Sequence, residues 1–129
     1  MAKLYKVGNF QLNTVSGAQA ITGVGFQPKA LLFYHQPVTI GTGVPQIANW
    51  YWSMGMADAS NQYAMWTFAP NGNGGLESSL YAQNNSNAIY AGSNGSVYHY
   101  ASVTSLDGDG FTINVGAPPH FPGVPYMVG

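Results

Sequence analysis

Glycine and proline interrupt this sequence every few residues, and their spacing is the feature that most limits its fold. The chain of 129 residues contains 17 Gly and 8 Pro, and both residue types disfavour the interior of a helix. No window between them has the 3.6-residue apolar periodicity of an amphipathic helix. The segments that remain are short, and most alternate apolar with polar residues, which is typical of strands. The sequence therefore predicts an all-β protein.

The segments between the turns can be assigned individually. Residues 30–34 are apolar throughout, which predicts a strand covered on both faces. In 47–57, Trp and Met occupy the even positions from 50 to 56, and smaller or polar residues occupy most odd ones. Stretches rich in Asn, Gly and Ser at 71–75, 83–87 and 93–95 are predicted to be loops. The predicted strands are 9–13, 30–34, 47–57, 63–68, 88–91, 97–105, 111–115 and 124–128.

A hairpin near the end of the chain is the clearest single unit. Its turn is Leu106-Asp107-Gly108-Asp109-Gly110, in which Gly permits positive φ and Asp can bond the backbone. Apolar residues then alternate with Thr, Asn and Gly from Phe111 onward. About eight short strands at this spacing predict an antiparallel β-sandwich or a jelly-roll-like fold. The length predicts a single domain over residues 1–129.

The low charge of the chain excludes several classes of function. Lys and Arg total 3, Asp and Glu total 4, and charged residues are 5 % of the chain, against about a quarter in an average domain. Nucleic-acid binding requires clustered cations, so it is not expected. Neither an apolar membrane span nor a basic amphipathic helix is evident, so no membrane partner is expected. A surface of amides, hydroxyls and aromatics suits a protein covered by its neighbours.

Few residues could carry catalysis or bind a metal. The histidines His35, His99 and His120 are scattered, there is no Cys, and no Gly-x-Ser-x-Gly motif is present. We therefore expect no enzymatic activity. Asp107 and Asp109 resemble the start of a calcium loop, but the later ligands of an EF-hand are missing. A hairpin turn explains them better, and no metal or other cofactor is expected.

Aromatic residues concentrate in the middle of the chain, at Trp50, Trp52, Tyr63 and Trp66, among Asn and Gln. Aromatic faces bordered by amides could form a platform for a carbohydrate. Trp and Tyr are also enriched in cores and at subunit interfaces. We favour a core or interface position, and a glycan platform is the alternative.

Residues 17–33 carry the most distinctive motif, in which TGVGFQPKA at 22–30 runs into an apolar strand. Pro28 fixes its own φ and favours an extended Gln27, while Gly23 and Gly25 permit a tight turn that Phe26 can close. We interpret Gly23, Gly25, Phe26 and Pro28 as a fold-defining turn. The motif, together with DGDGFTIN at 107–114, resembles a family of small tailed-bacteriophage proteins associated with virion structural genes.

The resemblance implies a non-enzymatic virion structural protein. Such a protein would decorate or cement the capsid, or would be a subunit of the tail or an appendage. Its expected partners are copies of itself, most simply in a trimer, and other virion proteins. The alternative is a carbohydrate-binding, receptor-recognition module on the virion surface. No leader-like pattern follows Met1, which agrees with synthesis in a bacterial cytoplasm followed by incorporation into the virion.

Overall fold

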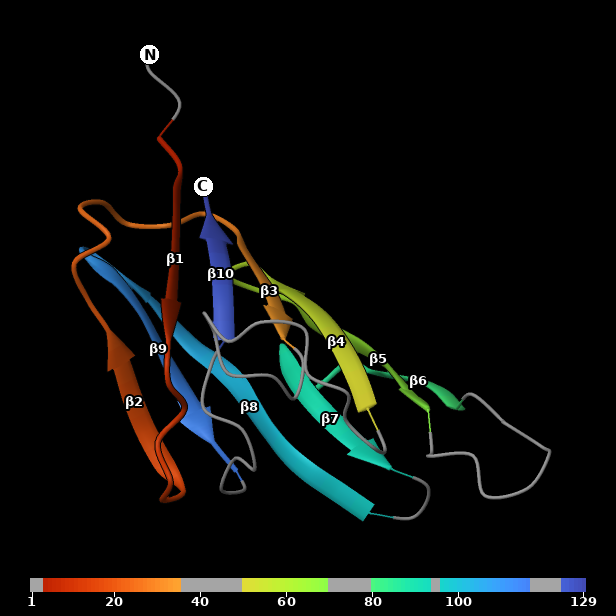
Figure 1. The fold of residues 1–129 in the computed structure, drawn as a ribbon. Helices are drawn as coiled ribbons and strands as arrows, with labels where there is room; N and C mark the ends of the chain where they lie inside the picture. Colours follow the sequence, from red (N-terminus) through yellow and green to blue (C-terminus); the bar gives the residue numbers. More distant parts are fainter. Residues whose placement is uncertain (1–3, 36–49, 70–79, 94–95, 117–123) are drawn as a thin grey trace, which may run out of the picture.

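Two antiparallel sheets face each other in this protein (Figure 1). The computed structural model describes residues 4–35, 50–69, 80–93, 96–116 and 124–129, and no helix occurs in these ranges. The predicted all-β sandwich is confirmed, although the strands number ten and not about eight. They are β1 (Lys6–Phe10), β2 (Gly17–Ile21), β3 (Leu31–His35), β4 (Trp50–Ala57), β5 (Gln62–Ala69), β6 (Leu80–Asn84), β7 (Ile89–Ser93), β8 (Ser96–Asp107), β9 (Gly110–Val115) and β10 (Val124–Val128).

In each sheet, a strand from the start of the chain pairs with a strand from its end. One sheet has the order β1-β10-β3-β4-β5-β6 and the other the order β2-β9-β8-β7. The pairs β1–β10 and β2–β9 are nested, because the first strands of the chain pair with the last. Strands β3 to β6 pair in the order of the sequence, and so do β7 to β9 in the other sheet. The predicted jelly-roll topology is therefore not confirmed.

Most of the predicted strands are found, and the first is misplaced. β10 spans the predicted 124–128, and the predicted hairpin is the β8–β9 pair. The strand predicted at 9–13 overlaps β1 only at residues 9–10, and the loop predicted at 93–95 is wrong at Ser93, which ends β7. Strands β2 and β6 were not predicted, and the loop assignment of 83–87 is wrong at its start because β6 continues to Asn84. The predicted loop at 71–75 and the predicted strand residues 47–49 lie outside the described residues.

The prediction that the strand at 30–34 is covered on both faces is wrong. Leu31, Phe33 and His35 are buried, whereas Tyr34 is 45 % exposed. The apolar run is therefore covered on one face only. Its other face belongs to the outer surface of the six-stranded sheet.

Two apolar clusters fill the space between the sheets. In the larger one, the rings of Phe10, Phe33, Phe111 and Tyr126 meet one another at centroid distances of 5.4–6.3 Å. Aliphatic residues from both sheets complete this cluster: Leu12, Ile21, Val24, Leu31, Ile89, Ile113, Val115, Val124 and Val128. The smaller cluster consists of Tyr51, Phe68 and Ala91, with Tyr98 packed against it.

The inner face of β4 begins with the buried ring of Tyr51 and continues with small residues. Ser53, Gly55 and Ala57 are buried there. A Cβ atom added to Gly55 would overlap the carbonyl oxygen of Ala88, which precedes β7 in the opposite sheet. The backbones of the two sheets therefore approach closely at this point, and the bulky even-numbered residues of β4 lie on the outer face.

Candidate functional site

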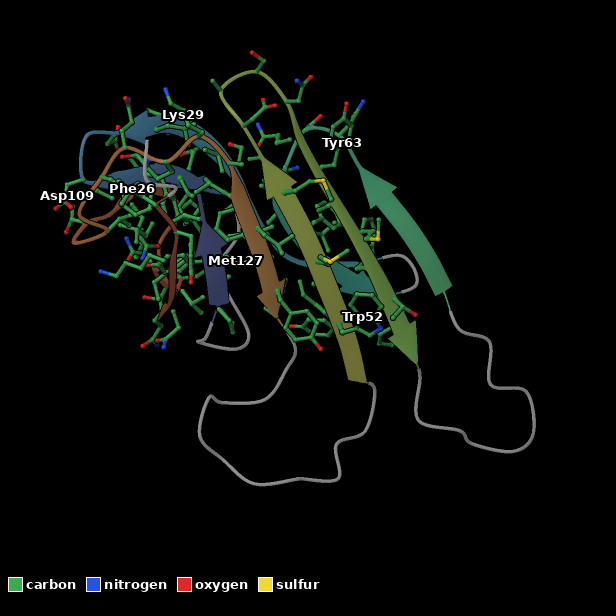
Figure 2. All side chains as sticks on the ribbon, turned by 90° about the horizontal axis from the view of Figure 1, so that it is seen from above. Phe26, Lys29, Trp52, Tyr63, Asp109 and Met127 are labelled. Carbon is green, nitrogen blue, oxygen red and sulfur yellow. The ribbon has the colours of Figure 1, made fainter. Side chains whose placement is uncertain are left out.

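The corner at residues 22–30 is built on two glycines with positive φ. Gly23 has φ +79° and Gly25 has φ +91°, a backbone region that residues with a Cβ rarely adopt. Phe26 packs partly buried against the larger cluster, and Pro28 is fully buried. All four residues interpreted as a fold-defining turn thus lie at one corner, which Figure 2 shows around Phe26.

Asp109 clamps this corner from the other end of the sequence. Its carboxylate accepts hydrogen bonds from the backbone N–H groups of Gly23 (3.0 Å) and Gly25 (2.5 Å), and its carbonyl accepts one from Val24 N–H at 3.1 Å. The bonds from Gly25 and then Gly23 hold the pKa of Asp109 below its usual value, and the charge of Lys6 adds to this. The two motifs that carry the resemblance therefore bind each other directly.

Replacing Asp109 by Ala is expected to loosen the corner, because two glycine N–H groups lose their acceptor. Amide exchange at Gly23 and Gly25, measured by NMR, should be several-fold faster. Lowering the pH through the depressed pKa of Asp109 should have the same effect in the wild type, since only the ionised form accepts both bonds. Asp58→Ala is the matched control, because within the described part of the chain the Asp58 carboxylate accepts hydrogen bonds from Ser60 and Asn61 of its own turn. Equal exchange rates in both variants would contradict the clamp.

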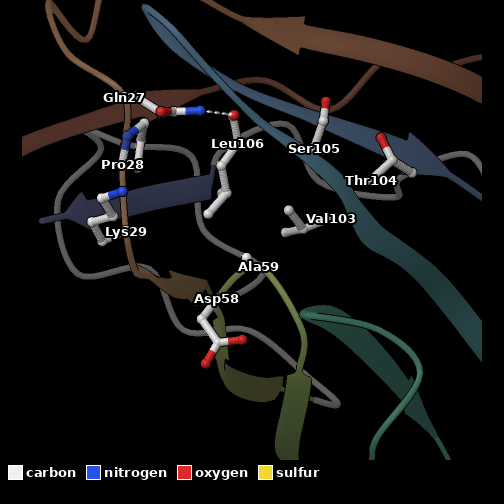
Figure 3. A pocket seen from close by; sticks show the side chains of 9 residues that line it. All are labelled: Gln27, Pro28, Lys29, Asp58, Ala59, Val103, Thr104, Ser105 and Leu106. Carbon is white, nitrogen blue, oxygen red and sulfur yellow. Dashed lines mark hydrogen bonds between the residues drawn. The ribbon is translucent and has the colours of Figure 1, made fainter.

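A hollow of about 240 Å³ lies beside this corner (Figure 3). It separates the corner from the β4–β5 turn, which supplies Asp58, and from the C-terminal part of β8. Gln27 closes one side by donating a hydrogen bond from Nε2 to the carbonyl of Leu106 at 2.7 Å. The described residues that line it include no aromatic side chain on which a sugar ring could stack: Gln27, Pro28, Lys29, Asp58, Ala59, Val103, Thr104, Ser105 and Leu106.

The outer face of the six-stranded sheet gathers exposed apolar side chains in two rows. In one row Met127, Leu32, Met56 and Tyr63 follow one another as cross-strand partners on β10, β3, β4 and β5. In the other row Tyr34, Met54 and Met65 do the same on β3, β4 and β5. Trp52 stacks on Tyr34, with ring centroids 6.1 Å apart. We call these residues the Met/aromatic face: Leu32, Tyr34, Trp52, Met54, Met56, Tyr63, Met65 and Met127.

This face is exposed and carries no formal charge. Tyr34, Met56, Tyr63, Met65 and Met127 are each 43–52 % exposed, and Figure 2 shows Trp52, Tyr63 and Met127 on the six-stranded sheet. The sequences of β3, β4, β5 and β10 contain no Asp, Glu, Lys or Arg. Four of the five methionines of the chain lie on this face, and the fifth is Met1.

The predicted aromatic residues do not form one platform. Trp52 and Tyr63 lie on the Met/aromatic face, whereas Trp66 points inward and stacks on Tyr90 of β7, with ring centroids 4.3 Å apart. Nothing is described of the side chain of Trp50. The core alternative therefore fits Trp66, and the interface alternative fits Trp52 and Tyr63.

Two histidines far apart in the sequence meet between the sheets. His35 Nε2 lies 2.6 Å from His99 Nε2, and both side chains are buried. His99 is therefore a packed, hydrogen-bonded residue. Its partner could not be identified from the sequence, because the two residues lie 64 positions apart. In the part of the chain that the structure describes, no third His, Asp or Glu joins them to complete a metal-ligand cluster.

No protein-family model, curated protein or solved structure matches this chain. Among the described residues, no helix has the length and apolar character needed to span a bilayer.

Proposed function

We propose that this protein is a non-enzymatic structural subunit of a bacteriophage virion, located on the capsid or in the tail or an appendage. The Met/aromatic face is the observation that supports this proposal. It places nearly all the methionines of the chain on one exposed and uncharged sheet surface. Methionine adapts its shape to a partner, and aromatic residues and Met are enriched where proteins bind one another.

The size of the face supports a protein partner. An aromatic or Met side chain that is about half exposed offers on the order of 100 Å². The five most exposed residues of the face therefore supply on the order of 500 Å², before Trp52, Met54 and Leu32 are added. The largest apolar patch on a typical monomer is about 300–600 Å² and is often functional. A soluble subunit that works alone has little use for such a surface.

Copies of the same chain are the first partner we propose. Charge repulsion between copies is weak, because the net charge is −1 and the apolar face has no charged residue. Association around a symmetry axis, with a trimer as the expected state, would present several equivalent faces to the virion. Weak contacts made many times then give strong attachment.

A carbohydrate-binding, receptor-recognition role is the second candidate. It is favoured by the half-buried Trp52 and the exposed Tyr63 on one face. It is opposed by the inward position of Trp66 and by the lack of aromatic side chains among the described residues that line the hollow in Figure 3. We rank it behind assembly.

Placing a charge on the Met/aromatic face should prevent assembly. Met65→Lys puts an ammonium where a neighbour would bury an apolar side chain, and burying an unpaired charge is costly. Val97→Lys is the matched control, because Val97 is 48 % exposed against 44 % for Met65 but lies on β8 of the other sheet. Light scattering of the purified chain and co-sedimentation with virions would measure the effect. We expect oligomers and bound particles for the wild type and Val97→Lys only.

The proposal is overturned by a wild-type protein that stays a monodisperse monomer at high concentration and binds neither capsid nor tail. If Met65→Lys assembles as the wild type does, assembly takes place through another surface.

A further inference from the structure

The His35–His99 contact is a hydrogen bond between two buried imidazole rings. The two Nε2 atoms are 2.6 Å apart, and the side chains are 3 % and 0 % exposed. A bond between two imidazole nitrogens needs a proton on one nitrogen and a free lone pair on the other. One ring therefore donates from Nε2 and the other accepts at Nε2. His35 belongs to β3 and His99 to β8, so this bond joins the two sheets.

Among the described residues, the side chains whose contacts with the pair are known are not negatively charged. Tyr51 of β4 packs against both rings, with centroids 5.7 Å from His35 and 5.8 Å from His99. Tyr98 of β8 packs in turn on Tyr51 at 5.8 Å. Burial raises the pKa of Tyr51 above its usual value, and Tyr98 adds to this shift, so the phenol stays neutral. Ser53 is the cross-strand neighbour of His35, and its buried Oγ has no hydrogen-bond partner among the described residues.

The described carboxylates lie at the ends of these strands and not beside the pair. Asp58 follows β4, five residues beyond Ser53. Asp107 and Asp109 lie at the β8–β9 turn, at least eight residues beyond His99. These carboxylates bond their own turns or the corner at Gly23 and Gly25.

We propose that the His35–His99 pair is an acid-sensitive lock between the two sheets, which holds the subunit closed at neutral pH and weakens it in mild acid. The same strands carry the Met/aromatic face on their other side, since Tyr34 precedes His35 and Trp52 precedes Ser53. Acid would therefore also weaken assembly through that face. This second consequence rests on the proposed function, whereas the lock itself does not.

Protonation of the histidine pair should lower the stability of the fold. One added proton puts an uncompensated charge in the interior, and a second puts two N–H groups against each other where one hydrogen bond stood. Burial, and secondarily the repulsion that a protonated His99 would exert, lowers the pKa of His35 to about 3. The unfolded chain binds the proton near the ordinary histidine pKa of about 6.5. Stability is therefore complete above pH 6.5 and falls as the pH drops from 6.5 towards 3.

Urea unfolding of the full chain between pH 8 and 5 tests the lock. Below pH 6.5, each further decrease of one pH unit should raise the unfolding equilibrium constant about tenfold for every histidine that stays neutral in the fold. The double variant His35→Gln/His99→Gln keeps an amide hydrogen bond but does not titrate, so its stability should change far less with pH. His120→Gln, which removes the third histidine, is the control and should follow the wild type.

A second measurement keeps the test decisive if the double variant does not fold. NMR of ¹³C-labelled histidine in the wild type should show two imidazoles that do not titrate down to pH 5.5 while the protein is folded. The lock is overturned if wild-type stability is flat between pH 7.5 and 5, or if all three histidines titrate near pH 6.5 in the folded state. Both measurements use the subunit alone, so a failure of the proposed virion role would leave them unchanged. Loss of oligomers at pH 5.5 in the wild type, but not in a folded double variant, would connect the lock to assembly.

Discussion

Gly55→Val should abolish soluble folding, and Gly55→Ala should lower the free energy of unfolding by about 3 kcal/mol or more. Gly55 lies on the inner face of β4, paired with Phe33 on one side and Ala64 on the other. A Cβ at this position would overlap the carbonyl oxygen of Ala88. Overpacking a core typically costs about 1–3 kcal/mol. The cost here should reach the top of that range, because the obstructing atom is backbone and cannot rotate away.

The effect is large relative to the stability of a domain of this size, which is about 5–15 kcal/mol. Ala88 also donates a backbone hydrogen bond to Ala101 at 3.1 Å, so moving it would disturb the start of β7. Gly108→Ala is the control, because a Cβ at Gly108 would meet no atom within 4 Å. Thermal unfolding would compare the three variants with the wild type. A Gly55→Val protein that melts with the wild type would show that the sheets do not approach closely at this point.

The close approach at Gly55 also explains what the sequence could not predict about β4. The alternation from Trp50 to Ala57 correctly separates the residues into two faces, because successive side chains of a strand point in opposite directions. It does not say which face is buried. Bulk and hydropathy favour the side with Trp52 and Met54. The structure buries the side with Ser53 and Gly55, since only small residues fit where two backbones meet.

Local pattern was sufficient for the β8–β9 hairpin. Apolar and polar residues alternate along β9, and the turn at Asp107–Gly110 is marked by its own residues. β10 has the sequence VPYMV, which does not alternate, and it could be predicted because it is a short apolar segment after a Pro-rich stretch. β2 has the sequence GAQAI and β6 has LYAQN, and neither alternates strongly enough to be recognised. Their place is set by pairing with β9 and β5.

The corner at residues 22–30 and the histidine pair are both formed by residues that lie far apart in the sequence. Gly23 and Gly25 predicted a tight turn, but nothing near them in the sequence indicates that Asp109 binds their N–H groups from 86 and 84 residues away. The same holds for His35 and His99. A histidine at a position where its neighbours in the pattern are apolar is the only sequence signal of such a pair, and it does not identify the partner.

Trp52→Ala and Trp66→Ala should have opposite effects on folding and assembly. Trp66 stacks on Tyr90 between the sheets, and its Nε1 is buried. Replacing a fully buried Trp by Ala costs about 3–5 kcal/mol through lost contacts and a cavity, and the loss at the half-buried Trp66 should lie near the lower end of this range. Trp52 packs on Tyr34 at the outer face, so its loss should cost the isolated subunit only about 0.5–1.5 kcal/mol, the value of an aromatic pair.

Two measurements on each variant separate the roles. Thermal unfolding should show a large decrease for Trp66→Ala and a small one for Trp52→Ala. Co-sedimentation of the folded molecules with virions should show a large loss of binding for Trp52→Ala and a small one for Trp66→Ala. A Trp at the centre of an interface is a frequent hot spot. Trp66→Phe keeps a ring against Tyr90 and removes the buried N–H group, so it should recover most of the stability lost in Trp66→Ala.

The pattern of results distinguishes the three roles of Trp52. A Trp52→Ala protein that does not fold would place this residue in the core, contrary to its position over Tyr34. One that folds but does not join the virion supports the Met/aromatic face as the assembly surface. One that folds and assembles normally but loses host adsorption would establish the carbohydrate-binding alternative. We expect the second result, because Trp52 lies among methionines and tyrosines that no charged residue interrupts on β3, β4, β5 and β10.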